Sequence, residues 1–218
     1  MMRYLIAAFL LVSCSKKEPS ESTPTTAPKP TAGPTATTPA PSDPKPGAGG
    51  DLGQHQAGCD KGDAKACVEL GLDYSAPRAG ATKDPKKTEA ALLKGCELGE
   101  GRACLFVAED YRDGSFSAEM EPDMAKAVQF AKRGCEAGTL DACDMFAAFL
   151  RNGWGTERDL EKAHKIFLET CEKGLASSCM SLVDGYNKKI FKPIGDKDAE
   201  YYRRKACSLG AKNACKNP

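Results

Sequence analysis

Residues 96–104 read CELGEGRAC, and the two cysteines that bound this stretch, Cys96 and Cys104, decide the fold. The same spacing of eight residues recurs four more times, at Cys59–Cys67, Cys135–Cys143, Cys171–Cys179 and Cys207–Cys215. Successive pairs begin 36–39 residues apart, and a glycine lies three residues after the first cysteine of every pair. Cysteines in even number at a fixed period of this length are typical of a repeat array joined by disulfides.

The spacing predicts how each pair is joined. In one unbroken helix, residues eight apart lie about 12 Å apart along the axis, whereas a disulfide needs Cα atoms within about 7 Å. The chain must therefore reverse direction, and the glycine is the residue type preferred just past a helix end. We expect the first cysteine in the last turn of one helix and the second in the first turn of the next, antiparallel helix. Zinc, haem or redox-sensing roles are the alternatives, but histidine occurs only as His55 and His164, and no Cys-x-x-Cys is present.

The N-terminus has the layout of an export signal. Arg3 precedes an apolar run over residues 4–12, far shorter than the about 20 residues that span a bilayer. The following LVSC at residues 11–14 resembles a bacterial lipobox, which predicts that residues 1–13 are removed and that Cys14 carries lipid. The alternative is an ordinary signal peptide that leaves a free thiol. Export supplies the oxidising compartment that disulfides require.

Residues 14–50 are rich in proline, threonine, serine and alanine and have almost no large apolar side chains. We expect a disordered linker that reaches on the order of 100 Å when extended, either as a long tether or as a plain flexible spacer. Ser15 resembles the signal that sorts lipoproteins to the outer membrane of a Gram-negative cell. The net charge of +1 disfavours nucleic acid as a partner, and the bilayer is expected to be contacted through the lipid anchor only.

Residues 51–218 are expected to form one folded domain in which each repeat has two helices. The apolar face of the first helix shows spacings of four, five and eight residues. In the four repeats this face begins at Ala66, Ala103, Ala142 and Ser178. The second helix starts at an acidic or proline signal. These signals are Asp84-Pro85, Glu121-Pro122-Asp123, Asp159, and either Asp196 or Asp198.

These motifs resemble Sel1-like repeats. The matching residues are Leu70-Gly71 with Tyr74, Asp123 with Lys126-Ala127, Asp159 with Lys162-Ala163, and Ala206-Cys207 with Gly210. The Cys-x7-Cys spacing resembles the cysteine-rich branch typified by the Helicobacter cysteine-rich proteins. The resemblance implies an all-α, right-handed superhelical α/α solenoid of about four helix pairs, stapled by disulfides.

The resemblance implies two classes of function. Sel1-like arrays resemble tetratricopeptide scaffolds, whose concave face binds proteins or peptides, often in the bacterial envelope. Some cysteine-rich members are described instead as penicillin-binding proteins or weak β-lactamases. Ser-x-x-Lys occurs only at residues 13–16 and 42–45, outside the expected domain, and Ser-Asp-Asn, Lys-Thr-Gly and His-Glu-x-x-His are absent. We predict a membrane-anchored scaffold without catalytic residues, cofactor or metal, with β-lactam hydrolysis as the alternative.

The first helices line the concave face in related solenoids. Removing the packing positions leaves Glu69, Asp73, Phe106, Asp110, Met145, Phe149 and Ser181 for that face. Phe106, Met145 and Phe149, flanked by carboxylates, predict a binding patch for a peptide with apolar and basic side chains. The alternative is that these three residues pack against neighbouring helices. Trp154, in the loop of the third repeat, is either a further contact or a buried loop anchor.

Overall fold

The structure is a computed structural model that describes residues 51–76, 81–116 and 120–215. All of these residues belong to one compact unit, Pro39–Pro218. The predicted signal peptide (1–13), the lipidated Cys14 and the linker (14–50) lie outside the described residues.

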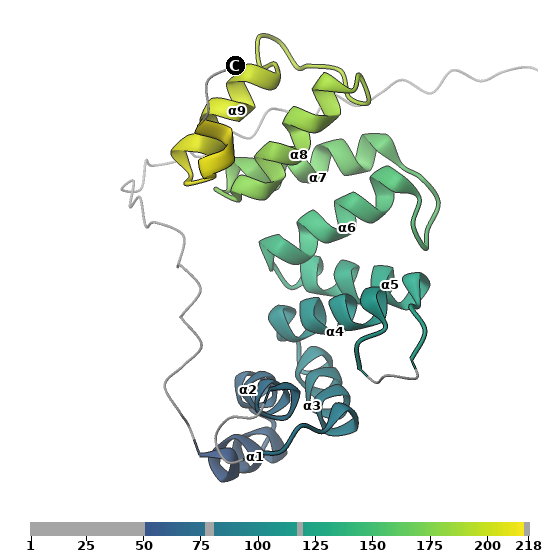
Figure 1. The fold of residues 1–218 in the computed structure, drawn as a ribbon, viewed down its shortest axis with the longest axis vertical. Helices are drawn as coiled ribbons and strands as arrows, with labels where there is room; N and C mark the ends of the chain where they lie inside the picture. Colours follow the sequence, from purple (N-terminus) through teal and green to yellow (C-terminus); the bar gives the residue numbers. More distant parts are fainter. Residues whose placement is uncertain (1–50, 77–80, 117–119, 216–218) are drawn as a thin grey trace, which may run out of the picture. The chain divides into compact units, whose positions relative to one another are not determined.

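The described residues form nine α-helices and one 3₁₀ helix (Figure 1). In chain order they are α1 (Leu52–Asp60), α2 (Ala64–Ser75), α3 (Pro85–Glu97), α4 (Gly101–Asp113), α5 (Met124–Glu136), α6 (Leu140–Asn152), α7 (Leu160–Glu172), α8 (Ala176–Asn187), α9 (Ala199–Ser208) and η1 (Lys212–Cys215). No strand occurs among them, although Ile194 and Lys197 form an isolated antiparallel bridge. The predicted all-α fold is confirmed, with four helix pairs from α2/α3 to α8/α9 and the single helix α1 before them.

Each helix packs on the helix before it and on the one after it in the sequence. Figure 1 shows this succession from α1, in blue, to α9, in yellow. Contacts also join α2 to α4 and α4 to α6, so these first helices of neighbouring pairs lie side by side. Because every pair buries its apolar face only against its neighbours, the array is a solenoid.

Five disulfides join the end of one helix to the start of the next, in the pairing that the spacing predicts. They are Cys59–Cys67, Cys96–Cys104, Cys135–Cys143, Cys171–Cys179 and Cys207–Cys215. Their Cα–Cα distances are 4.3–4.9 Å. The glycine after each first cysteine has φ between 88° and 99°, the left-handed region that strains other residues.

The prediction that both cysteines of a pair lie in α-helices holds for four of the five disulfides. In the pair that opened the sequence analysis, Cys96 lies in the last turn of α3 and Cys104 in the first turns of α4, with Cα atoms 4.7 Å apart. The prediction is wrong for Cys215, which lies in the four-residue 3₁₀ helix η1. Short helical pieces commonly take this tighter form.

Small residues let consecutive helices cross closely beside the disulfides. A Cβ added at Gly134 of α5 would lie 2.7 Å from the Cβ of Ala142 in α6. Between α7 and α8, the corresponding residues are Thr170 and Ser178, whose hydroxyls are 2.7 Å apart. The Ser178 hydroxyl also donates to Asp144 at 2.6 Å. These buried hydroxyls are therefore hydrogen-bonded where α5 and α6 have glycine and alanine.

Aspartates begin the second helices as predicted. Asp84, Asp123, Asp159 and Asp198 each accept a hydrogen bond from the backbone N–H three residues ahead. This is the N-cap interaction that satisfies a free donor at a helix start. Of the two aspartates that the sequence left open for α9, the cap is Asp198.

Candidate partner-binding groove

The four predicted contact residues lie in different surroundings. Phe106 in α4 and Met145 in α6 are partly buried and pack against the core with part of their surface. Trp154, between α6 and α7, is 52% exposed, so it is not a buried anchor. Phe149 is 1% exposed. The sequence left open whether Phe149 contacts a partner or packs against neighbouring helices, and the structure shows that it packs in the core. Phe149 is therefore not available to a partner at the surface.

Phe149 occupies a repeat position that is buried in three of the four pairs, whereas its equivalent in the second pair, Asp110, is half-buried. The equivalent residues in the first and fourth pairs, Asp73 and Gly185, are buried too. Asp73 was expected at the surface, but its Oδ2 lies 2.5 Å from Nδ1 of His55 in α1. A helix that packs on both sides buries more than one face, and spacing alone does not tell which of its residues stay exposed.

A groove of about 270 Å³ opens between α2, α3 and α4, with Phe106 in its lining. Its apolar lining includes Leu72, Leu92, Phe106 and Phe116. The polar residues around it are Ser75, Lys83, Thr88, Glu109, Asp110 and Ser115. Ligand pockets for drug-sized molecules begin at about 300 Å³, so this α2–α4 groove is of a size for one or two side chains of a peptide.

The two carboxylates of the α2–α4 groove are half-buried. Burial raises the pKa of Glu109 above its ordinary value, although Arg112 opposes the shift. Burial also raises the pKa of Asp110, which the hydrogen bond from the Ser115 hydroxyl opposes. A cation brought by a ligand would favour the charged form of both groups. Because these two carboxylates outnumber the one cation among the described residues of the lining, Lys83, the groove suits an apolar side chain followed by an ammonium or guanidinium group.

Arg102 contacts Phe106, one of the residues that line the groove. Its guanidinium carbon lies 5.3 Å from the centroid of the Phe106 ring, and its NH1 lies 3.9 Å from Glu69 of α2. The stacked cation and the ion pair link α2 to α4.

A second pocket, of about 500 Å³, lies between α6, α8 and η1. Its lining is Arg151, Ala176, Ser177, Met180, Ser181, Asp184, Ala211 and Asn213. Ser181 has the position in α8 that Phe106 has in α4, so this α8–η1 pocket is a polar counterpart of the α2–α4 groove. The sequence predicts Ser181 for the concave face, but it does not predict Ala211 and Asn213, which come from a segment without a helical periodicity.

The two histidines are engaged in contacts inside the fold. The Nε2 atom of His164 lies 2.9 Å from the Tyr186 hydroxyl, and its ring stacks on Phe191 at 4.6 Å. Burial lowers the pKa of His164. In the part of the chain that the structure describes, no three His, Cys, Asp or Glu side chains are grouped so that they could hold a metal ion. No helix of the same residues has the length and apolar character needed to cross a membrane.

Comparison with known proteins gives structural neighbours. No protein-family model and no curated protein matches the sequence. A Sel1 repeat protein from Oxalobacter formigenes superimposes with a TM-score of 0.66 and 23% identity, over 75% of this chain and 63% of that one. A protective antigen present in uropathogenic Escherichia coli strains, with an SLR fold, superimposes with a TM-score of 0.66 and 24% identity, over 76% of this chain and 35% of that one. Helicobacter pylori cysteine rich protein B superimposes with a TM-score of 0.47 and 24% identity, over 60% of this chain and 91% of that one.

The first two neighbours are longer than this chain, which spans 63% and 35% of their lengths. At identities below one quarter, the likeness concerns the fold and not the activity. The helix pairs, their order and the first two neighbours agree with the resemblance to Sel1-like repeats found in the sequence. The described part of this chain therefore has the fold of the Sel1 repeat proteins.

Proposed function

We propose that this protein is a binding scaffold of the cell envelope that holds peptide segments of other proteins in the α2–α4 groove. The observation that carries the proposal is the combination of an apolar lining with two half-buried carboxylates, Glu109 and Asp110. Repeat solenoids use such extended surfaces to bind partners. The ligand is a segment with an apolar side chain that inserts beside Phe106 and a lysine or arginine next to it.

The cellular setting is part of the proposal. Five disulfides support an oxidising, exported compartment. The proposed anchor is lipid on Cys14, which places the protein at a membrane, the outer membrane if the cell is Gram-negative. Incorporation of labelled palmitate, lost in Cys14→Ser, tests the anchor. An unlabelled wild-type protein would contradict it.

Fluorescence anisotropy with two labelled peptides tests the groove. One peptide combines leucine with lysine and arginine, and the other has glutamate at every basic position. We expect the apolar–basic peptide to bind and the apolar–acidic peptide to bind far more weakly, because like charges meet at Glu109 and Asp110. Equal binding of both peptides, or of neither, would contradict the proposal.

Matched variants separate the groove from the rest of the surface. Phe106→Ala should weaken the apolar–basic peptide by about tenfold or more, as for a residue central to an interface. Ser181→Ala changes the equivalent position of α8 and should leave binding unchanged. The circular dichroism of both variants must match that of the wild type, since unfolding of Phe106→Ala would instead make Phe106 a core residue. A chromogenic β-lactam added to the oxidised wild type tests the alternative of hydrolysis.

A further inference from the structure

The five disulfides differ in how far they lie from solvent. The cysteines of three pairs, Cys59–Cys67, Cys96–Cys104 and Cys171–Cys179, are all buried, with exposures from 0% to 2%. In the pair Cys135–Cys143, Cys143 is 8% exposed and Cys135 is partly exposed. Cys215 is exposed, and its partner Cys207 is partly exposed. Cys207–Cys215 is thus the most accessible disulfide of the described residues.

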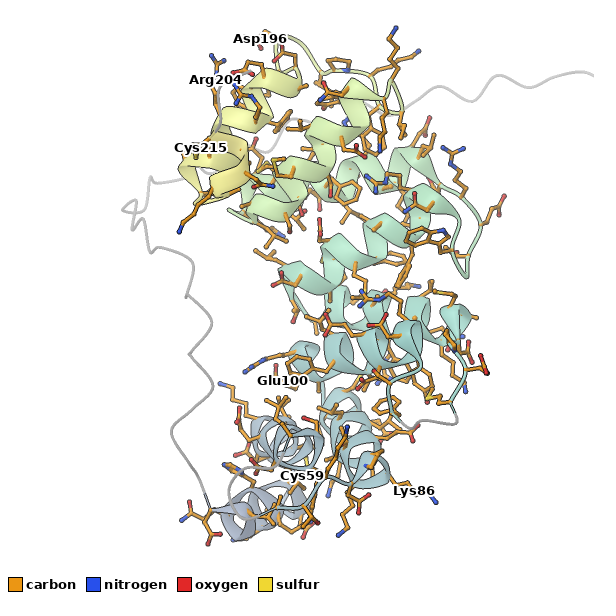
Figure 2. The ribbon with its side chains drawn as sticks, viewed as in Figure 1. Cys59, Lys86, Glu100, Asp196, Arg204 and Cys215 are labelled. Atoms are coloured by element: carbon orange, nitrogen blue, oxygen red, sulfur yellow. A yellow bond between two sulfur atoms is a disulfide. The ribbon has the colours of Figure 1, made fainter. Side chains whose placement is uncertain are left out.

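Two exposed cations lie close to this pair in the sequence. Arg204 lies three residues before Cys207 in α9, and Lys212 lies three residues before Cys215 in η1, and both are exposed. Figure 2 labels Arg204 and Cys215 at the same end of the array, with Cys59 at the opposite end. Positive charge near a disulfide attracts an incoming thiolate.

The same disulfide holds one wall of the α8–η1 pocket. Ala211 and Asn213, which line that pocket, lie inside the loop that Cys207–Cys215 closes. Apart from the disulfide, this segment is held by the buried Ala214, whose carbonyl accepts a hydrogen bond of 2.9 Å from Arg203. It is also held by the Ala211 N–H, which donates to the Ala206 carbonyl at 3.0 Å. When the covalent link is broken, this wall is held by non-covalent contacts at the end of the array, so it would open locally without unfolding the other helices.

We propose that Cys207–Cys215 is a site of thiol–disulfide exchange, and that reduction there releases η1 and opens the α8–η1 pocket. The reactant is a thiolate, from a small thiol or from a dithiol protein. Its sulfur attacks Sγ of the exposed Cys215, a mixed disulfide forms, and Cys207 leaves as a thiolate. A second thiol then attacks the reactant's sulfur in the mixed disulfide and frees Cys215. The two protein cysteines gain two electrons and two protons, and the two reactant thiols become one disulfide.

Timed labelling tests the site. The oxidised protein is treated with reduced glutathione or with a reduced thioredoxin-type protein, quenched with N-ethylmaleimide and mapped by mass spectrometry. We expect Cys207 and Cys215 to be labelled about tenfold or more faster than Cys59 and Cys67, a buried pair with the same spacing. If glutathione alone gives faster labelling of Cys207 and Cys215, a small thiol is sufficient as the reactant. If only the dithiol protein gives it, the reactant is a dithiol oxidoreductase. Labelling of another pair first, or of all five pairs together, overturns the proposal.

Hydrogen exchange tests the consequence. In Cys207→Ser/Cys215→Ser, the backbone amides of Ala211 and Ala214 should exchange faster while helical circular dichroism is kept. Cys59→Ser/Cys67→Ser is the matched control, and it should leave exchange at Ala211 and Ala214 unchanged. Unchanged protection of Ala211 and Ala214 without the disulfide would overturn the proposed opening. The labelling of the wild type decides the exchange site even if a variant does not fold.

Discussion

Replacement of Gly134 by alanine tests how closely consecutive helices cross. The added Cβ would lie 2.7 Å from Cβ of Ala142, 3.0 Å from the carbonyl oxygen of Gly101 and 3.4 Å from Cβ of Cys104. None of these atoms is the end of a flexible side chain, so α4 and α6 must move away from α5. Overpacking of this kind costs about 1–3 kcal/mol.

The helix itself gains from the same change. Alanine is favoured over glycine inside a helix by about 0.8–1.0 kcal/mol, which offsets part of the cost. A Cβ–Cβ distance of 2.7 Å places the cost near the upper end of that range, so we expect Gly134→Ala to lower the free energy of unfolding by about 2 kcal/mol. In a domain of this size, that corresponds to a fall of about 4–8 °C in the melting temperature.

The assay is unfolding of the oxidised protein by heat and by urea, followed by circular dichroism. Gly53→Ala is the control, because Gly53 is exposed and the nearest atom to an added Cβ there is a carboxylate oxygen of Asp51, at 3.5 Å. It should leave stability unchanged or raise it. Combining Gly134→Ala with Ala142→Gly removes the closest contact, so the two losses should be less than additive. A Gly134→Ala protein as stable as the wild type would refute the close crossing.

Three further predictions concern pH and the disulfides. Affinity for the apolar–basic peptide should fall on acidification, and because burial raises the pKa of Glu109 and of Asp110, the fall should begin above the pH of about 4 expected for exposed carboxylates. Titration calorimetry with the peptide at decreasing pH measures this fall. An affinity that stays constant down to a pH of about 4 would argue against a role of both carboxylates in binding. Burial lowers the pKa of His164 in the folded protein below its ordinary value of about 6.5. Between these two pKa values the unfolded chain binds more protons at His164 than the folded chain does, so the free energy of unfolding falls as the pH drops through this window. Thermal melts of His164→Phe should lack that loss, and an equal loss in the variant would exclude His164 as its source. Complete reduction should lower the melting temperature strongly, since each disulfide closes a loop worth roughly 2.5 kcal/mol in chain entropy; an unchanged melting curve would contradict this.

Local chemistry in the sequence was enough to predict much of the fold. The cysteine spacing and the glycine that follows determine where each turn lies, as between Cys96 and Cys104, because few residues tolerate a positive φ. The aspartate caps were equally readable, since a side chain that accepts from the third N–H ahead leaves a local signature. Cys215 was harder, because the same spacing is compatible with an α-helix and with the 3₁₀ helix that is present.

The groove could be predicted only in part. Phe106 and Asp110 were found because they stand out on one predicted helix face. Leu92 and Phe116 come from α3 and from the segment after α4, and no spacing rule brings them to Phe106. The burial of Phe149 likewise depends on which helix covers it, and this is a property of tertiary packing.

The most direct test of the central claim is a titration of the oxidised, ¹⁵N-labelled protein with the apolar–basic peptide, followed by amide chemical shifts. Binding in the α2–α4 groove predicts that the largest changes in amide chemical shift occur at Phe106, Glu109 and Asp110, while the amide shifts of Ser177 and Ser181 do not change. Shifts centred on α8, or none anywhere at saturating peptide, would contradict the account.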